Sequence, residues 1–456
     1  MRARALLSSS AVVSLAMAAV MACKKDPPPE PAPTANGPLI VPPALSVVPE
    51  ALPRCRVEGA PLAIPGEDVI VGDAIVTSDA LWVGVVRGEG KKRLAGLVKA
   101  ALDLTSQKIV EIAPSGGDDP PPSPRLARGA TAVTYFTRSP RKLQIARVDA
   151  AGTLGKIDAI VPQQSDESLA YDVAWPEGQG TEASAPLVAW DEDAPPSTDM
   201  TKVPILGVPD RGVVKVQLGV DGAKSRVASP ETSDAESPRL APRKGGYWLA
   251  WLARKPDPRE DGGVRAEGPG EHRAFRWVEL VALDAKGEAA SPVRRVSPAQ
   301  GRVVAFDLAR GATDRELVVL VQDEAARAEG GGERLVRYVV DGEKADKIEG
   351  SDLVDAGIGQ ALAEIVPAPW QGSQPQRWLS FADVRERTHL VPLGAGVRSA
   401  GAPTAEPTLD GARVLASGPG DTVFAVGSSG ATGADGGALS TALGAGRVEL
   451  RRLSCR

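Results

Sequence analysis

A turn motif recurs along most of this sequence and restricts the folds open to it. Each copy is an apolar residue, then aspartate, then a turn that usually contains Gly, Ser or Lys, and it follows a short apolar run. The copies are Leu102-Asp103, Val148-Asp149, Val220-Asp221, Leu283-Asp284 and Val340-Asp341, with Leu393-Gly394 as a degenerate sixth. Asp and Gly suit the geometry of tight hairpins. The motif therefore predicts repeated units of short strands, with these aspartates as turn residues.

A second repeat has the same spacing. Strands open near Asp73, Leu126, Ala170, Leu240, Val304, Leu362 and Val414, at intervals of about 57 residues. Helical periodicity is scarce, while short Val, Leu, Ile and Trp runs bounded by Gly, Pro and Asp recur. A period of about 40–60 residues with three or four strands is typical of a β-propeller blade. We expect an all-β chain with residues 54–456 forming a propeller of seven blades, with six to eight as the possible range.

Strand assignments follow within the later blades. The second and third strands are expected at 247–252 and 275–283 in blade four, 317–321 and 335–340 in blade five, and 422–426 and 448–453 in blade seven. The sequence given ends there, so blade seven has no fourth strand of its own. We expect the segment Arg54 to Ile64 to supply that strand and to close the ring.

The cysteines agree with this register. Cys455 ends the third strand of blade seven, and Cys55 begins the segment expected beside it. In an antiparallel pair those two ends meet, so a disulfide between Cys55 and Cys455 is expected, provided that the compartment is oxidising. Free thiols or intermolecular pairing are the alternatives.

The third cysteine, Cys23, ends an N-terminal apolar segment that begins after Arg2 and Arg4. The segment is diluted by serines, which favours a secretory signal over a membrane span. Its end, Val20-Met21-Ala22-Cys23, resembles the lipobox of bacterial lipoproteins. That resemblance implies a signal peptide over 1–22 and lipidation of Cys23; an uncleaved anchor and ordinary secretion are the alternatives.

A tether is expected over residues 23–53. Ten of the 30 residues from Lys24 to Pro53 are proline, which excludes helix and central strand over most of the segment. Extended polyproline would reach roughly 90 Å. Because Lys24 follows the cysteine, where lipoproteins retained in the inner membrane carry aspartate, the resemblance favours the outer membrane of a bacterial cell envelope.

Charge and spacing argue against several functions. The formal net charge of −5 disfavours nucleic acid as a partner. His272, in the blade-four insertion, and His389, expected on the third strand of blade six, belong to no metal-ligand cluster and are interpreted as solvated or strand-edge residues. No Gly-x-Ser-x-Gly elbow or Walker loop is present. The acidic residues Asp191-Glu192-Asp193 and Asp199 lack the spacing of a calcium loop and are interpreted as a solvated loop. We therefore name no catalytic residue, metal ligand or cofactor.

Tryptophan is the remaining side chain of interest. Carbohydrate stacking is one interpretation, but most of the eight lie within apolar runs, which favours packing between blades. Trp370 is the best candidate for an exposed one, because Pro and Gly surround it. The sequence lacks the Asp-box of sialidases and the marks of other propeller subfamilies, so the resemblance is to propeller architecture alone.

Insertions indicate where function could lie. Four blades carry a long connection between their second and third strands, at 192–210, 254–273, 323–333 and 428–446. Such connections emerge on one face, and loops on a rigid scaffold often carry function, although neutral drift is an equal alternative. The expected function is binding or scaffolding of a protein or glycan partner by a membrane-anchored propeller. A glycan hydrolase or lyase and a passive structural lipoprotein are the alternatives.

Overall fold

The computed structural model divides the chain into two units, Met1–Ser46 and Val47–Arg456. The described residues all belong to the second unit: 55–89, 92–114, 124–127, 131–138, 141–160, 170–175, 185–193, 212–220, 224–256, 274–311, 316–323, 333–342, 345, 347–358, 363–366, 378–382, 387–392, 409, 412–429 and 447–455. Cys23 and the expected tether lie outside them. Among these residues, no helix is long and apolar enough to span a membrane.

The second unit is an all-β propeller whose described strands form seven sheets. Blades one to three are β3 (Ile70–Val76), β4 (Ala80–Arg87), β5 (Leu94–Ala101) and β6 (Gln107–Pro114); β7 (Arg125–Ala127), β8 (Thr131–Arg138), β9 (Arg141–Val148) and β10 (Leu154–Ala159); β11 (Tyr171–Ala174), β12 (Leu187–Asp193), β13 (Gly212–Leu218) and β14 (Arg226–Val227). Each sheet is an antiparallel meander in chain order.

Blades four to six follow the same plan. They are β15 (Asp234–Arg243), β16 (Gly246–Pro256), β17 (Ala274–Asp284) and β18 (Arg294–Arg295); β19 (Val303–Arg310), β20 (Leu317–Asp323), β21 (Glu333–Asp341) and β22 (Lys347–Ile358); β23 (Glu364–Ile365), β24 (Trp378–Ala382) and β25 (Thr388–Pro392). The strands expected in blades four and five lie within β16, β17, β20 and β21, so those assignments are confirmed.

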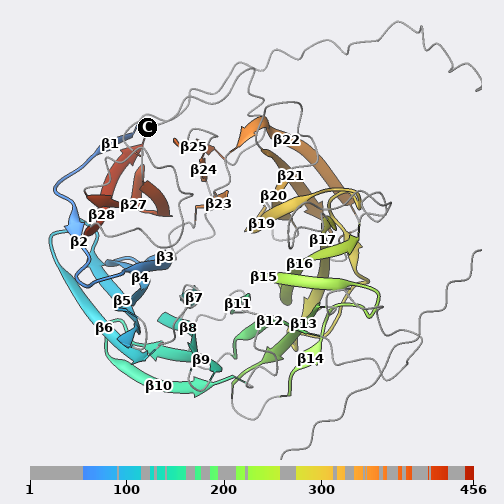
Figure 1. Cartoon of the computed structure of the whole chain (residues 1–456), viewed down its shortest axis with the longest axis horizontal. Coiled ribbons are helices and arrows are strands. Elements are labelled where there is room, and N and C mark those ends of the chain that lie inside the picture. Colours follow the sequence, from blue (N-terminus) through green and yellow to red (C-terminus); the bar gives the residue numbers. More distant parts are fainter. Residues whose placement is uncertain are drawn as a thin grey trace, which may run out of the picture. The chain divides into compact units, whose positions relative to one another are not determined.

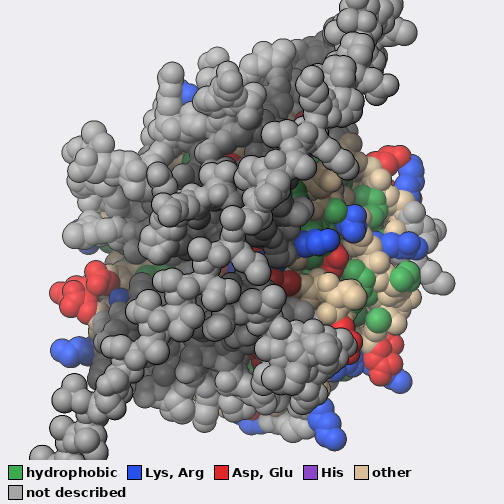
Figure 2. Space-filling view, turned by 45° about the vertical axis from the view of Figure 1, so that its right-hand side comes forward, with side chains coloured by type: hydrophobic (Ala, Val, Ile, Leu, Met, Phe, Trp, Pro, Cys, Tyr) green, Lys and Arg blue, Asp and Glu red, His purple; other side chains and the backbone are tan. Residues whose placement is uncertain are grey.

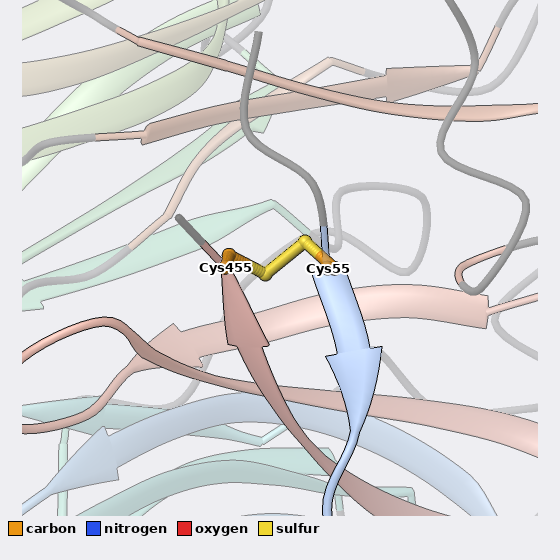
Figure 3. The surroundings of a disulfide bond; sticks show 2 residues. All are labelled: Cys55 and Cys455. Atoms are coloured by element: carbon orange, nitrogen blue, oxygen red, sulfur yellow. A yellow bond between two sulfur atoms is a disulfide. The ribbon is translucent and has the colours of Figure 1, made fainter.

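Blade seven is built from both ends of the propeller unit. Its strands β26 (Ala412–Ser417), β27 (Thr422–Ser429) and β28 (Arg447–Cys455) are joined by β1 (Cys55–Val57) and β2 (Leu62–Ala63), which both pair antiparallel with β28. The expected closure by an N-terminal strand is therefore confirmed. Cys55 lies directly opposite Cys455, and the two form a disulfide with a Cα–Cα distance of 4.0 Å (Figure 3).

The sheets follow one another round a ring, with the first strand of each nearest its centre (Figure 1). Neighbouring first strands contact each other from β3 to β23, and β26 contacts β3. The core lies between sheets: one cluster joins Phe424 and Leu450 of blade seven to Val83 and Val98 of blade one. A sheet buries its apolar face only against its neighbours, so each blade depends on the ring.

The expected turn aspartates occupy the hairpins between third and fourth strands. Asp103 Oδ1 accepts the Thr105 N–H at 3.1 Å, and Asp149 Oδ1 accepts that of Thr153 at 2.7 Å. Asp284 and Asp341 end the third strands of their blades. Asp221 and Gly394 lie outside the described residues.

Candidate functional site

A charged residue lies at a corresponding position of every inner strand, directly before an apolar residue. These seven partly exposed residues, called here the inner ring, are Asp73 (β3), Arg125 (β7), Asp172 (β11), Arg239 (β15), Asp307 (β19), Glu364 (β23) and Arg413 (β26). The inner strands lie nearest the centre of the ring (Figure 1), so the inner ring is a set of charged residues on the innermost strands.

The inner-ring charges act on one another across blades. The pKa of Arg125 is raised above its ordinary value chiefly by Asp73 of blade one, against the effect of burial, and also by Asp172 and Asp307 of blades three and five. Carboxylates on other blades would have little effect on Arg125 if bulk water and salt screened their charges. Arg125 therefore lies within the field of carboxylates from blades one, three and five.

The three aspartates of the inner ring hold neighbouring blades together. Asp73 Oδ2 accepts the Leu126 N–H at 3.3 Å, while its Oδ1 pairs with Arg125 at 3.0 Å. Asp172 Oδ2 accepts the N–H of Leu240 at 2.7 Å. Asp307 Oδ2 accepts that of Ile365 at 2.9 Å. In each case an odd-numbered blade binds the inner strand of the next, even-numbered blade.

The join between the last and first blades uses an arginine instead. Arg413 pairs with Glu364 of blade six through two nitrogens, each 2.9 Å from a carboxylate oxygen. Its Nη1 also donates to the carbonyl oxygens of Val71 at 3.0 Å and Gly72 at 3.4 Å in blade one. One guanidinium therefore connects three blades.

Two inner-ring carboxylates have raised pKa values. Burial raises the pKa of Asp307 from 3.8 to about 6, against the hydrogen bond from the Ile365 N–H. Burial likewise raises the pKa of Asp172, while Arg125 and Arg239 lower it. A raised carboxyl pKa is a feature of many active sites, but structural groups share it. Both carboxylates here are held by two backbone N–H groups each.

A band of ion pairs marks the end of the blades from which the second-to-third connections leave. Arg254 near the end of β16 pairs with Asp234 and, at 3.6 Å, with Glu236, which also lies 3.7 Å from Arg276. Asp234 Oδ1 accepts the Gly212 N–H of blade three at 2.7 Å. These contacts link β15, β16 and β17 with β13 at the end of blade four where its second-to-third connection leaves. Figure 2 shows charges of both signs among apolar side chains on one described part of the surface.

The insertion bounds expected from the sequence are partly wrong. Residues 192–193, 254–256, 323, 333 and 428–429 belong to strands, so the connections run over 194–211, 257–273, 324–332 and 430–446. Those connections lie outside the described residues. Their position between second and third strands agrees with the expectation.

The interpretation of Asp191 and Glu192 as a solvated loop is also wrong. Both lie in β12 and are buried, because β12 pairs with β13 as far as Asp193 opposite Gly212. Glu192 is compensated by Lys215 and by the Trp190 Nε1–H, both at 2.6 Å. Burial raises the pKa of Asp191 to about 6. Asp199 lies outside the described residues.

The histidine and tryptophan interpretations have mixed outcomes. His389 lies on the third strand of blade six as expected, but it is fully buried and stacks on Phe381 with ring centroids 4.9 Å apart. Trp82, Trp190 and Trp251 are buried in the cores, which agrees with packing rather than carbohydrate stacking.

His272 and Trp370 lie outside the described residues. No group of three metal-binding side chains occurs in the described ranges.

Sequence reasoning located the inner strands but missed the inner ring. A signal was present, because a charged residue stands before an apolar residue in every inner strand, as in Asp172-Val173 and Arg239-Leu240. Aligning the seven strands at that step would have revealed the ring.

Comparison with known proteins assigns the chain to no family. No family model and no curated protein matches it. Among solved structures, the β-propeller domain of the Trilobed protease from Pyrococcus furiosus is similar with a TM-score of 0.42 and 12% identity, over 80% of this chain and 90% of that one. Pyrococcus horikoshii acylaminoacyl peptidase matches with a TM-score of 0.42 and 10% identity, over 80% of this chain and 50% of that one.

The polysaccharide lyase Uly1 is similar to the same degree. Its TM-score is 0.42 and its identity 10%, over 86% of this chain and 90% of that one. These neighbours differ in activity, and none bears on the activity of this chain.

Proposed function

We propose that this chain is a lipid-anchored protein of the bacterial cell envelope whose propeller binds a protein or glycan partner. The membrane is contacted through lipid on Cys23, the Pro-rich segment 23–53 acts as a tether, and the outer membrane is the favoured location. The partner binds the face from which the second-to-third connections leave, called here the insertion face. Neither nucleic acid nor a cofactor takes part.

The observation that supports this proposal best is the placement of the four long connections. All join a second strand to a third strand of a meander blade, and in a propeller such connections leave from one face. The connections therefore begin and end at one face of the propeller. A ring held by inter-blade hydrogen bonds and the Cys55–Cys455 disulfide is the kind of rigid scaffold on which binding loops are usually carried.

A glycan hydrolase or lyase is the competing function, and the raised pKa values of Asp172 and Asp307 are the observation in its favour. A retaining or inverting hydrolase needs one carboxyl group free to donate a proton and a second free to attack or activate water. Asp172 and Asp307 instead use both oxygens to accept backbone N–H groups. These hydrogen bonds fix the two carboxylates and favour their ionised forms, so we assign neither as a proton donor or nucleophile, although each oxygen keeps a second lone pair.

Metabolic labelling with palmitate tests the anchor. The wild-type protein should incorporate label and fractionate with membranes, whereas Cys23→Ala should do neither. Equal labelling of the two proteins would remove Cys23 from the proposal.

Crosslinking in intact cells followed by pull-down tests the binding face. Variants with shortened 257–273 or 430–446 connections should lose a partner that the wild type captures, while keeping the wild-type melting temperature. If both variants capture the same partners as the wild type, those connections do not bind them. A passive structural role predicts no specific partner for any of the proteins.

A further inference from the structure

Arg239 differs from the other two arginines of the inner ring. Arg125 pairs with Asp73, and Arg413 pairs with Glu364. Within the described residues, Arg239 has no carboxylate at ion-pair distance; its Nη1 donates at 3.0 Å to the carbonyl oxygen of Pro238, its own neighbour in the chain. A guanidinium has five N–H donors, so most of those on Arg239 are left for another acceptor.

Arg239 is recessed and yet reachable by solvent. Burial is the largest cause lowering the pKa of Arg239, followed by the charge of Arg125, while Asp172 and Asp307 raise it. Its side chain nevertheless keeps partial exposure. The guanidinium is therefore partly exposed and lies within the field of two carboxylates.

The backbone before Arg239 is held in an unusual conformation. Ser237 has φ of 56°, a left-handed value that costs energy for any residue except glycine. The buried carboxylate of Asp191 accepts the Ser237 N–H at 2.8 Å and so stabilises this turn. The β15–β16 register shifts between Glu236 and Arg239, and such bulges re-aim the side chains beside them. Asp191 is thus a positioning residue for Arg239.

We propose that Arg239 binds the carboxylate of a uronic acid, as part of a glycan that enters the centre of the propeller. This inference rests on the part of the proposed function in which the propeller binds a glycan, and it adds a site at the centre that is separate from the insertion face. A planar guanidinium binds a carboxylate through two parallel hydrogen bonds. The flanking Asp172 and Asp307 give one lone pair of each oxygen to a backbone N–H, which leaves the second lone pair for a donor on the ligand.

The same arrangement favours a sugar over an acidic peptide. A uronic acid carries neutral hydroxyl donors elsewhere on the same sugar ring as its carboxylate, which suit Asp172 and Asp307 while the carboxylate meets Arg239. An acidic peptide segment offers carboxylates without hydroxyl donors on the same unit, so Asp172 and Asp307 would face its negative charge without a hydrogen bond, and like charges repel. The ring thus matches one carboxylate surrounded by hydroxyl groups.

Titration calorimetry on the whole chain tests the inference with a trigalacturonate and its carboxyl-reduced trisaccharide as probes. The wild type should bind the first and not the second. Arg239→Gln should weaken binding by about 10- to 100-fold, as expected for hydrogen bonds to a charged group, and Arg239→Lys should fall between. Arg294→Gln removes an exposed arginine from β18 of the same blade and should bind like the wild type.

Three outcomes would overturn the inference: no binding by the wild type at millimolar trigalacturonate, equal affinity of the Arg239 variants, or binding of a tri-glutamate peptide instead of the sugar. A melting temperature for each variant separates lost binding from lost folding. If shortened connections abolish partner capture while trigalacturonate does not bind, the proposed function stands and this inference fails. If trigalacturonate binding depends on Arg239 while the shortened variants keep their partners, this inference stands and the insertion-face proposal fails.

Discussion

Arg413 of blade seven donates an Nη1 hydrogen bond to the carbonyl oxygen of Val71 in blade one, at 3.0 Å. The two residues lie 342 positions apart in the sequence. The same side chain makes a two-point ion pair with Glu364 of blade six. This side chain thus links the last and first blades at the centre of the ring, while β1, β2 and the disulfide complete blade seven at the periphery.

Replacing Arg413 should weaken this closure. Arg413→Met leaves the carboxylate of Glu364 partly buried without its cation, and we expect the free energy of unfolding to fall by about 2–4 kcal/mol. Arg413→Lys keeps the charge but loses the two-point geometry, so it should show a smaller loss. Urea denaturation measures both, with Arg294→Met on an exposed outer strand as the control. A loss no larger than that of the control would show that Arg413 does not close the ring.

The disulfide should contribute at the outer edge of the same blade. Cys55→Ser with Cys455→Ser removes a link between residues 400 positions apart. The expected loss in free energy of unfolding is about 2–5 kcal/mol. Denaturation with and without reductant checks it, because reduced wild type should match the double variant. Mass mapping without reductant should recover the joined peptides, and free thiols at both positions would refute the link.

Gly72 should tolerate no side chain. A Cβ on this residue would collide with the carbonyl oxygen of Pro124, which also accepts the Asp73 N–H at 3.2 Å. Gly72→Ala must therefore separate blades one and two, at a cost of about 1–3 kcal/mol in thermal or urea unfolding. Gly155→Ala is the matched strand control, since its Cβ meets only one backbone oxygen, at 3.3 Å. Equal effects of the two changes would contradict the close approach.

Asp307 should make stability depend on pH. Its pKa is raised by burial from 3.8 to about 6, so between pH 4 and 6 the folded state keeps a proton that the unfolded state releases. Stability from this group is therefore greatest below about pH 4, falls as pH rises to about 6, and is flat above, by up to about 3 kcal/mol in all. Asp307→Asn does not titrate and should lack this fall. Parallel pH profiles of the two proteins would disprove the assignment.

The repeated strands could be predicted because their signals are local. Apolar runs such as Leu317 to Val321 lie within a single strand, and the N-terminal closure follows from counting strands. Glu192 and His389 were misinterpreted because the groups that compensate them, Lys215 and Phe381, lie on other strands. The hydrogen bonds of the inner ring are harder still to predict from the sequence. Asp172 binds Leu240, and Arg413 binds Val71, across blade boundaries that no local pattern specifies.

Site-specific photo-crosslinking in intact cells tests the binding face most directly. A photoreactive residue at Lys255, exposed near the end of β16, samples the insertion face, and one at Lys286, exposed in the turn after β17, samples the opposite end of the same blade. We predict a specific adduct from position 255 and none from position 286. Adducts from 286 alone, or from neither position, would contradict partner binding at the insertion face.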